Sequence, residues 1–202
     1  MHLDFSQLTP TERYFTMTQA IIPRPIAWIL TENLNGSHNL APYSYFTPIC
    51  SDPPLVLISA GKKAQGIEAG QPKDTVLNIT GRQHFVIHIP TAEQINAVQK
   101  SAALMHYGES EVEQLGLELT QFGDFPLPRL KDSSIALACR LHRLDEIGNT
   151  PQAVIYGEIL SVYIADNLLN AQNRIDPLLL NPLSKLGGAN YAPLDTIIQP
   201  EL

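Results

Sequence analysis

Apolar residues early in the chain fall into short runs of strand length that are separated by turn signals. One run covers residues 26–31, and Pro25 biases Arg24 before it toward extended backbone, so a strand begins here. Residues 33–36 (Asn-Leu-Asn-Gly) follow, and an Asn-Gly pair between apolar runs is typical of a tight hairpin turn. Residues 38–41 supply the returning strand. The pattern therefore predicts a β-hairpin.

Four later runs also predict strands. Residues 55–60 form an apolar run rich in β-branched side chains, which indicates a strand buried on both faces. Residues 84–89 form another apolar run of strand length. Residues 135–141 and 154–162 alternate between two faces, and both runs exceed ordinary strand length, as long strands that wrap around a barrel do.

Helices are predicted where capping signals precede helical spacing. A short helix follows Thr9-Pro10 in a polar lead-in. Residues 72–79 have helical spacing and begin with a proline suited to a first turn. Thr91-x-x-Gln94 and Ser110-x-x-Glu113 are capping-box patterns, and each precedes a short helix.

These elements predict a mainly β fold with α additions, in which an antiparallel barrel carries appended helices. A doubly wound sheet would need strands and helices to alternate throughout, and the final third of the chain does not alternate in this way. No Gly/Ser linker or repeat divides the sequence. We therefore expect a single domain over residues 1–202, with its core at about residues 20–192.

Composition excludes several classes of protein. The 202 residues are 44% hydrophobic and 16% charged, which is globular rather than disordered composition. The formal net charge is −7 and there is no dense Lys/Arg run, which argues against a nucleic-acid partner. No apolar run has transmembrane length and the start is unlike a signal peptide, so we expect a soluble cytoplasmic protein without a membrane partner. Cys50 and Cys139 are expected to be reduced thiols.

The common catalytic motifs are absent from the sequence. There is no GxGxxG, no GxxxxGK[ST] and no GxSxG. His84 and His88 share one strand face, but no further ligand stands at metal spacing, so we interpret them as two half-buried histidines rather than a metal site. Asn78-Ile79-Thr80 matches a glycosylation acceptor, which we interpret as a chance match inside a helix.

Small hydrogen-bond donors beside turns remain as candidate chemistry. Lys73 and Thr75 lie near a predicted helix start, where unpaired N–H groups and the helix dipole favour a phosphate. The alternative is that the hydroxyl groups cap their own elements and the lysines are solvated. The full set of these donors is Ser44, Ser59, Lys62, Lys63, Lys73, Thr75 and Asn78.

The order and spacing of several short segments resemble the flavin reductase-like, FMN-binding split-barrel family, which includes flavoredoxin-like proteins. The resemblance extends from about residue 22 to residue 192. The segments that carry it are Pro23–Ala27, Asn39–Phe46, Asp52–Val56, Lys73-Asp74-Thr75-x-x-Asn78-Ile79, Phe85–His88, Gly157–Ile159 and Leu186-Gly187-Gly188-x-x-Tyr191-Ala192.

The resemblance implies an antiparallel split β-barrel that works as a homodimer and holds FMN noncovalently near the dimer interface. It places Asn39, Ala41, Pro42, Tyr43 and Ser44 beside the isoalloxazine ring, with backbone and hydroxyl contacts. It places Ser59, Lys62, Lys73 and Thr75 at the ribityl chain and phosphate, Arg24 at the phosphate or ring, and Tyr191 over the ring, from this chain or its partner. No metal and no catalytic acid–base residue is implied.

One departure from the family leaves the electron donor open. Many members carry a histidine a few residues before the Gly-Glu pair, where this chain has Gln152 or Tyr156 before Gly157-Glu158. The first hypothesis is an FMN-dependent oxidoreductase of flavin reductase type that takes hydride from NAD(P)H. The second is an electron-transfer flavoprotein of flavoredoxin type, exchanging electrons with protein or small-molecule partners. The third is a non-catalytic split-barrel binding module.

Overall fold

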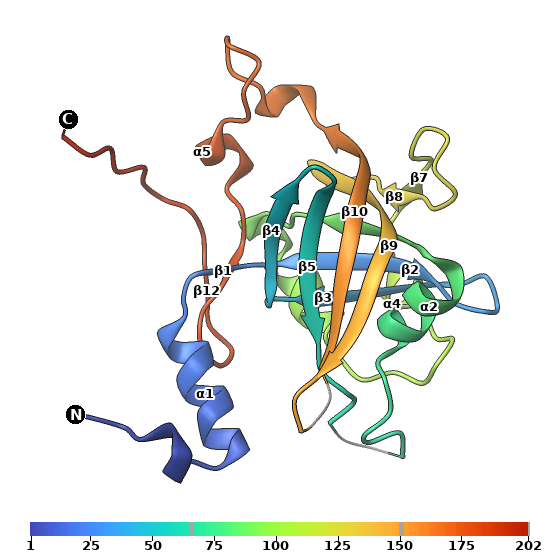
Figure 1. Ribbon diagram of the computed structural model, residues 1–202. Coiled ribbons are helices and arrows are strands. Elements are labelled where there is room, and N and C mark those ends of the chain that lie inside the picture. The colour runs from blue at the N-terminus through green and yellow to red at the C-terminus, as the bar shows by residue number, and fades with distance from the viewer. Residues whose placement is uncertain (65–66, 150–151, 202) are drawn as a thin grey trace.

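A seven-stranded antiparallel sheet forms the body of the computed structural model, which describes residues 1–64, 67–149 and 152–201. The strands are hydrogen-bonded in the order β3-β2-β6-β9-β10-β5-β4, and the sheet curls so that β3 also contacts β5 (Figure 1). The prediction of a mainly β, antiparallel fold with added helices is confirmed. The strand bounds are β2 Ala27–Glu32, β3 His38–Tyr43, β4 Phe46–Ser51, β5 Pro54–Ala60, β6 His84–His88, β9 Ile135–Ile147 and β10 Gln152–Ile164.

The predicted hairpin is formed by β2 and β3. Ala27 pairs with Tyr43 at one end of the ladder and Glu32 pairs with His38 at the other. Gly36 in the turn has a φ of 83°, a left-handed conformation that glycine adopts without the steric cost of a Cβ. The two long strands, β9 and β10, each span 13 residues and pair along their length with two register shifts.

Two hydrophobic clusters pack on opposite faces of β2. Trp28 and Leu30 belong to one cluster, whereas Ala27 and Ile29 belong to the other. Alternate side chains of a strand point to opposite faces, so β2 is buried on both sides. The central sheet therefore provides a rigid base for the loops around it.

Strand β5 is buried on one face only, which corrects the prediction for residues 55–60. Val56 and Ile58 are buried in the core, whereas Leu55 and Leu57 on the other face are only half-buried. β5 lies beside the edge strand β4, and Figure 1 shows no described helix in front of β4, β5 and β10. An apolar run therefore does not by itself show how many faces of a strand are covered.

The helices lie near the predicted positions, with two corrections. Helix α1, Pro10–Ala20, has 11 residues, more than the predicted short helix, and a capping box between Thr9 and Glu12 starts it. Helix α2, Asp74–Arg82, begins after Pro72 rather than with it, because Lys73 keeps extended backbone as the N-cap. The shorter helices are η1 Phe5–Gln7, η2 Ala92–Gln94, α3 Ile95–Lys100, α4 Glu111–Gln114, η3 Asp166–Leu168 and α5 Pro177–Leu180.

Two small sheets complete the fold. The first pairs β1, β11 and β12, and the second pairs β7 with β8. The turn after β11 packs on α1 so closely that a Cβ on Gly187 would lie 2.7 Å from Cγ of Gln19. In the described part of the chain, no helix is long and apolar enough to cross a membrane. The bounds are β1 Arg24–Pro25, β7 Leu119–Thr120, β8 Arg129–Leu130, β11 Ser184–Lys185 and β12 Tyr191–Ala192.

The two strand histidines differ in burial, which corrects their description as a half-buried pair. His84 is half-buried, but His88 is fully buried. Nε2 of His88 accepts a hydrogen bond of 3.0 Å from the backbone N–H of Leu130, and its Nδ1 lies 3.1 Å from the carbonyl oxygen of Trp28. Burial lowers the pKa of His88 to about 4, so the imidazole is neutral in the core. Its two nitrogens have a structural role there.

Candidate functional site

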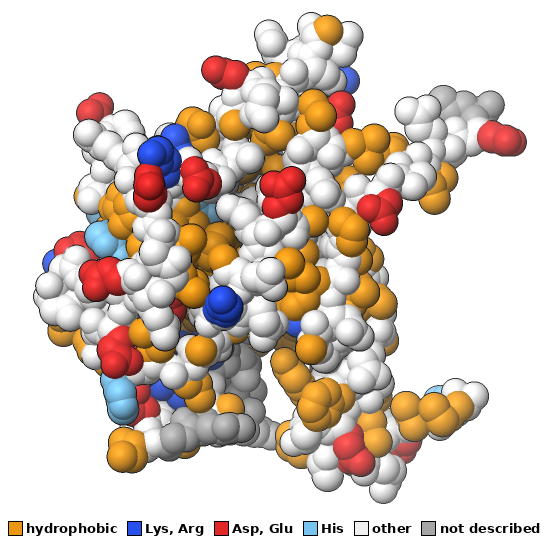
Figure 2. Space-filling view, turned by 180° about the vertical axis from the view of Figure 1, so that it is seen from behind, with side chains coloured by type: hydrophobic (Ala, Val, Ile, Leu, Met, Phe, Trp, Pro, Cys, Tyr) orange, Lys and Arg blue, Asp and Glu red, His pale blue; other side chains and the backbone are white. Residues whose placement is uncertain are grey.

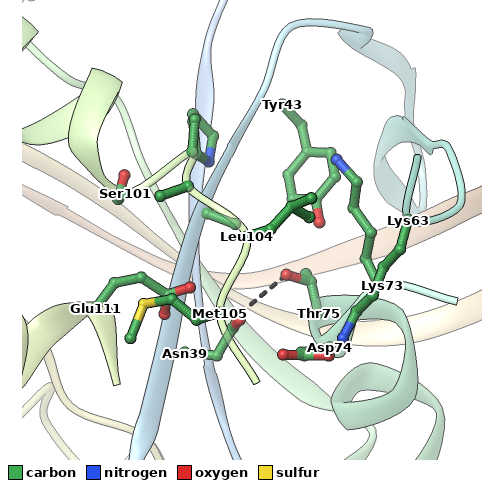
Figure 3. A pocket seen from close by; sticks show the side chains of 14 residues that line it. Asn39, Tyr43, Lys63, Lys73, Asp74, Thr75, Ser101, Leu104, Met105 and Glu111 are labelled. Carbon is green, nitrogen blue, oxygen red and sulfur yellow. Dashed lines mark hydrogen bonds and ion pairs between the residues drawn. The ribbon is translucent and has the colours of Figure 1, made fainter. Parts of the chain in front are cut away.

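A polar recess lies between strand β3, the start of α2 and the segment after α3 (Figure 3). Trp28 anchors that segment, because its indole N–H donates a hydrogen bond of 2.9 Å to Oγ of Ser101. We call this the narrow recess. The residues that line it are Asn39, Ala41, Pro42, Tyr43, Lys63, Lys73, Asp74, Thr75, Ser101, Ala102, Ala103, Leu104, Met105 and Glu111.

Buried hydrogen bonds fix the floor of the narrow recess. The amide of Asn39 donates to Oγ1 of Thr75 at 2.9 Å and to Oγ1 of Thr31 at 3.2 Å. Asn78, one turn along α2, donates to the same Thr31 oxygen at 3.0 Å. These bonds tie α2 to the β2–β3 hairpin, so the Thr75 hydroxyl is held in one place.

The two lysines of the narrow recess have different electrostatic roles. Nζ of Lys63 is 2.6 Å from both Asp74 and Glu68, so its charge is neutralised. Lys73 makes no ion pair with any described residue, and its Nζ lies 5.2 Å from the centre of the Tyr43 ring. Burial lowers the pKa of Lys73, because desolvation penalises its charged form. A bound anion would relieve that penalty.

Two further features favour an anion beside Lys73. No described side chain caps the N-terminus of α2, so its first backbone N–H groups are open to a ligand. The Tyr43 hydroxyl is buried beside Thr75 and has no hydrogen-bond partner among the described residues. Buried polar groups are rarely left unpaired in proteins. The unpaired donors therefore fit a phosphate group held at this end of the recess.

A buried carboxyl group closes the opposite side of the narrow recess. Glu111 is the first residue of α4, and its Oε2 accepts a hydrogen bond of 2.9 Å from the backbone N–H of Leu40. Burial, and to a smaller extent the nearby Asp74 carboxylate, raises the pKa of Glu111 to about 7. Glu111 therefore carries a proton over much of the acidic pH range, which limits the negative charge in the recess.

A second, wider recess of about 340 Å³ adjoins the first and shares Pro42 and Tyr43 with it. The Tyr191 hydroxyl on its wall donates a hydrogen bond of 2.7 Å to Oε1 of Gln99. We call this the wide recess. The residues that line it are Ile26, Pro42, Tyr43, Ser44, Gln99, Ala102, Lys185, Gly188, Ala189 and Tyr191.

Eight of the eleven predicted binding residues line these two recesses. Asn39, Ala41, Pro42, Tyr43, Lys73 and Thr75 line the narrow one, and Pro42, Tyr43, Ser44 and Tyr191 line the wide one. The structure brings these residues together from strands and helices that are far apart in the sequence. Their contacts with FMN stay a prediction.

Three predicted binding residues lie outside both recesses. Ser59 alternates to the outer face of β5, and its N–H bonds the carbonyl oxygen of Tyr45. Lys62 is exposed to solvent. Arg24 is buried, but its guanidinium is occupied by structural hydrogen bonds. Its acceptors are the carbonyl oxygens of Thr18, Ile21 and Leu186 and Oγ of Ser44.

Three parts of the narrow recess are absent from the predicted FMN contacts, although Lys63 was among the candidate donors. The capping pattern at residues 110–113 could have placed Glu111 in a first helical turn, but it gives no sign of burial. Lys63 has no signal that separates it from Lys62. The segment 101–105 is irregular and carries no motif, so only the folded chain shows that it lines the narrow recess (Figure 3).

Comparison with known proteins identifies the family. The family described as flavin reductase like domain matches residues 18–182 of this chain. The chain belongs to the flavin reductase like domain family. The resemblance of the sequence motifs to this family is thereby confirmed.

Several solved structures have the same fold as this chain. Nitrilotriacetate monooxygenase component B from Bacillus cereus is 30% identical, with a TM-score of 0.91 over 99% of this chain and 98% of that one. 2-Nitrobenzoate 2-nitroreductase from Pseudomonas fluorescens is 28% identical, with a TM-score of 0.88 over 100% and 96%. A split-barrel protein from Shewanella frigidimarina, at 20% identity and a TM-score of 0.83 over 100% and 99%, shares the fold. The fold is thus the split barrel, and the chain is of the oxidoreductase kind.

Proposed function

We propose that this chain binds FMN noncovalently across the two recesses and acts as an NAD(P)H-dependent oxidoreductase of flavin reductase type. The observation that carries the proposal is the group of unpaired donors around the Lys73 ammonium. Thr75, Tyr43 and the open N-terminus of α2 line the same narrow recess as Lys73, in a family described as flavin reductase like. The phosphate end of FMN would lie there, and the ring end along residues 41–44.

The two recesses would bind different parts of FMN. Lys73 and Thr75 bind the phosphate by charge-assisted and hydroxyl hydrogen bonds. The backbone of residues 41–44 orients the ring, and Tyr191 limits the access of water from the opposite wall. When bound, FMN supplies the hydride and single-electron chemistry, so the protein needs no acid–base pair of its own.

The experiment is NAD(P)H oxidation by the purified protein under steady turnover with added FMN. We expect a rate above background that depends on both the protein and FMN. A rate no higher than that of free FMN would remove the reductase proposal. The visible spectrum of the same preparation then shows whether flavin is bound and released on denaturation.

An electron carrier of flavoredoxin type is the second candidate, and two residues of β10 favour it. Gln152 and Tyr156 occupy the neighbourhood in which many family members carry a histidine. Tyr156 stacks against Arg143, with 5.4 Å between the guanidinium carbon and the ring centre, and neither Gln152 nor Tyr156 lines a recess. This candidate predicts a yellow protein that a redox partner reduces and NAD(P)H does not. A colourless protein without FMN affinity would indicate the non-catalytic binding module.

We also propose that the chain works as a homodimer. Thr18 is the only residue of the 11-residue helix α1 that is buried, whereas Tyr14 is 55% and Ile21 60% exposed. A short helix gains most of its stability from packing its apolar face, and this chain leaves that face uncovered. Figure 2 shows hydrophobic side chains exposed over this part of the molecule. A second copy of the chain would cover this exposed face of α1.

A further inference from the structure

One wall of the wide recess is positively charged and has no counter-charge. Lys185 lines this recess, and Arg24 is its cross-strand neighbour in the β1–β11 pair. Neither side chain forms an ion pair with a described residue, and no Asp or Glu of the described chain lines the wide recess. The whole chain has 20 acidic and 13 basic residues, so the positive wall is a local feature of this recess.

The small three-stranded sheet fixes the position of Lys185. Strand β11 lies between β1 and β12, so Lys185 pairs with Arg24 on one side and with Tyr191 on the other. Its Nζ lies 3.8 Å from the centre of the Tyr191 ring, and the hydrogen bond to Gln99 holds that ring. Arg24 also donates a hydrogen bond of 2.9 Å to the carbonyl oxygen of Leu186, the residue after Lys185. The ammonium is therefore held at a preorganised place.

The two cations act on the recess from different depths. Arg24 is 7% exposed, and its guanidinium donates to three carbonyl oxygens and to Oγ of Ser44, so it contributes its charge from behind the wall. The ammonium of Lys185 is in the wall itself. Partial burial and the charge of Arg24 both lower the pKa of Lys185, because desolvation and repulsion penalise its charged form. A negative charge in the recess would relieve both penalties.

The proposed function places the FMN ring in this recess, and reduction changes the charge of that ring. A hydride from NAD(P)H brings two electrons and one proton, so the ring gains one negative charge while the nicotinamide becomes positively charged. A fixed cation beside the ring attracts reduced FMN more strongly than oxidised FMN. No carboxylate among the described lining residues of the wide recess opposes this attraction.

We propose that Lys185, with Arg24 behind it, raises the reduction potential of bound FMN by stabilising the negative charge that the ring gains on reduction. This inference rests on the proposed function and deepens it, because it names the residue that adjusts the redox chemistry of the same site. Binding and reduction are thermodynamically linked, so a higher potential means that the protein binds reduced FMN more tightly than oxidised FMN.

Redox titration of FMN-saturated protein against a reference dye tests the role of Lys185. Wild-type protein should hold FMN at a higher potential than that of free FMN. Lys185→Gln should lower the potential of bound FMN by about 30 mV or more, which is a tenfold loss of preference for reduced FMN in a two-electron couple. Lys185→Arg keeps the charge and should keep the wild-type potential. Lys62→Gln, at an exposed residue outside both recesses, is the control and should match wild type.

The outcomes separate this inference from the proposed function. Failure of wild-type protein to bind FMN in a fluorescence titration would overturn the proposed function. A purely structural role for Lys185 would weaken the binding of oxidised and reduced FMN equally, so an unchanged potential in Lys185→Gln would overturn the role of Lys185 alone. A wild-type potential below that of free FMN would overturn it too, and that comparison decides the question even if Lys185→Gln does not fold.

Discussion

Lys62 and Lys63 are neighbours in the sequence but have opposite environments in the structure. Lys62 is exposed, whereas Lys63 is 7% exposed and pairs with Asp74 and Glu68. Lys63 affects anion binding at the start of α2 indirectly. It neutralises Asp74 and thereby leaves Lys73 as the unpaired cation there. A phosphate at Lys73 would be repelled if Asp74 lost this partner.

Glu111 gives the stability of the protein a defined pH dependence. Its carboxyl group ionises near pH 4.5 in the unfolded chain and near pH 7 in the folded one. As the pH rises between these values the unfolded chain releases this proton and the folded chain keeps it, so the free energy of unfolding falls. The loss is about 3 kcal/mol and is complete above pH 7.

Glu111→Gln should remove this loss, because the amide cannot ionise and can still accept the hydrogen bond from Leu40. Urea unfolding from pH 4 to pH 8 measures it. Between pH 4 and pH 8, the free energy of unfolding of the variant should rise by about 3 kcal/mol relative to that of wild type. The exposed Glu113→Gln on the same helix should follow wild type. Parallel profiles for Glu111→Gln and wild type would show that Glu111 is not perturbed.

At the scale of elements, β10 and β6 depend on a close approach at one glycine. A Cβ on Gly157 would lie 2.5 Å from Cζ of Phe85, a fully buried ring of the core. The Gly-Glu pair that helped to indicate the family therefore has a structural reason for its glycine. Glu158 beside it forms a surface ion pair of 2.8 Å with Arg140.

Gly157→Ala should lower the free energy of unfolding by about 1–3 kcal/mol, because the added methyl group forces the Phe85 ring to move in a packed core. Thermal and urea unfolding measure the loss. Gly81→Ala in α2 is the matched control, since nothing lies within 4 Å of its Cβ position. That change should be neutral or stabilise the helix by up to about 1 kcal/mol. A neutral Gly157→Ala would show that the ring yields easily.

Sequence patterns predicted the positions of helices and strands better than they predicted which side chains are buried. The Asn-Gly turn and the capping residues Thr9 and Ser110 act within a few positions, so their signals are readable from the chain alone. The outer face of β5 and the burial of His88 depend on which elements pack nearby, and no local pattern records that. The same limit explains Ser59: its strand was predicted, but the face on which it lies was not.

Across the whole molecule, the two recesses join β3, α2, α3, α4 and the β11–β12 hairpin, which lie far apart along the chain. Family motifs indicated Asn39, Thr75 and Tyr191 because these residues lie in segments whose order and spacing resemble the family. Glu111 and the segment 101–105 belong to no such motif and enter the site only through folding. The fold was therefore more predictable than the lining of the site.

The exposed face of α1 gives a test of assembly. Light scattering at micromolar concentration should give twice the chain mass of 22.3 kDa. Tyr14→Asp with Phe15→Asp should shift the protein toward the single-chain mass, because the two exposed rings would become charged. Leu34→Asp, at a residue 77% exposed in the hairpin turn, is the matched control and should stay dimeric. A monomeric wild-type protein would refute the homodimer.

The most direct test of the FMN site is a fluorescence titration of FMN into Lys73→Ala with Thr75→Ala. Charge-assisted contacts contribute about 1.5–3 kcal/mol each, so loss of both should weaken FMN binding about 100-fold or more. Ser59→Ala with Lys62→Ala, outside both recesses, should bind FMN as wild type does. If the Lys73/Thr75 variant folds and binds FMN with wild-type affinity, the phosphate is not held at the start of α2.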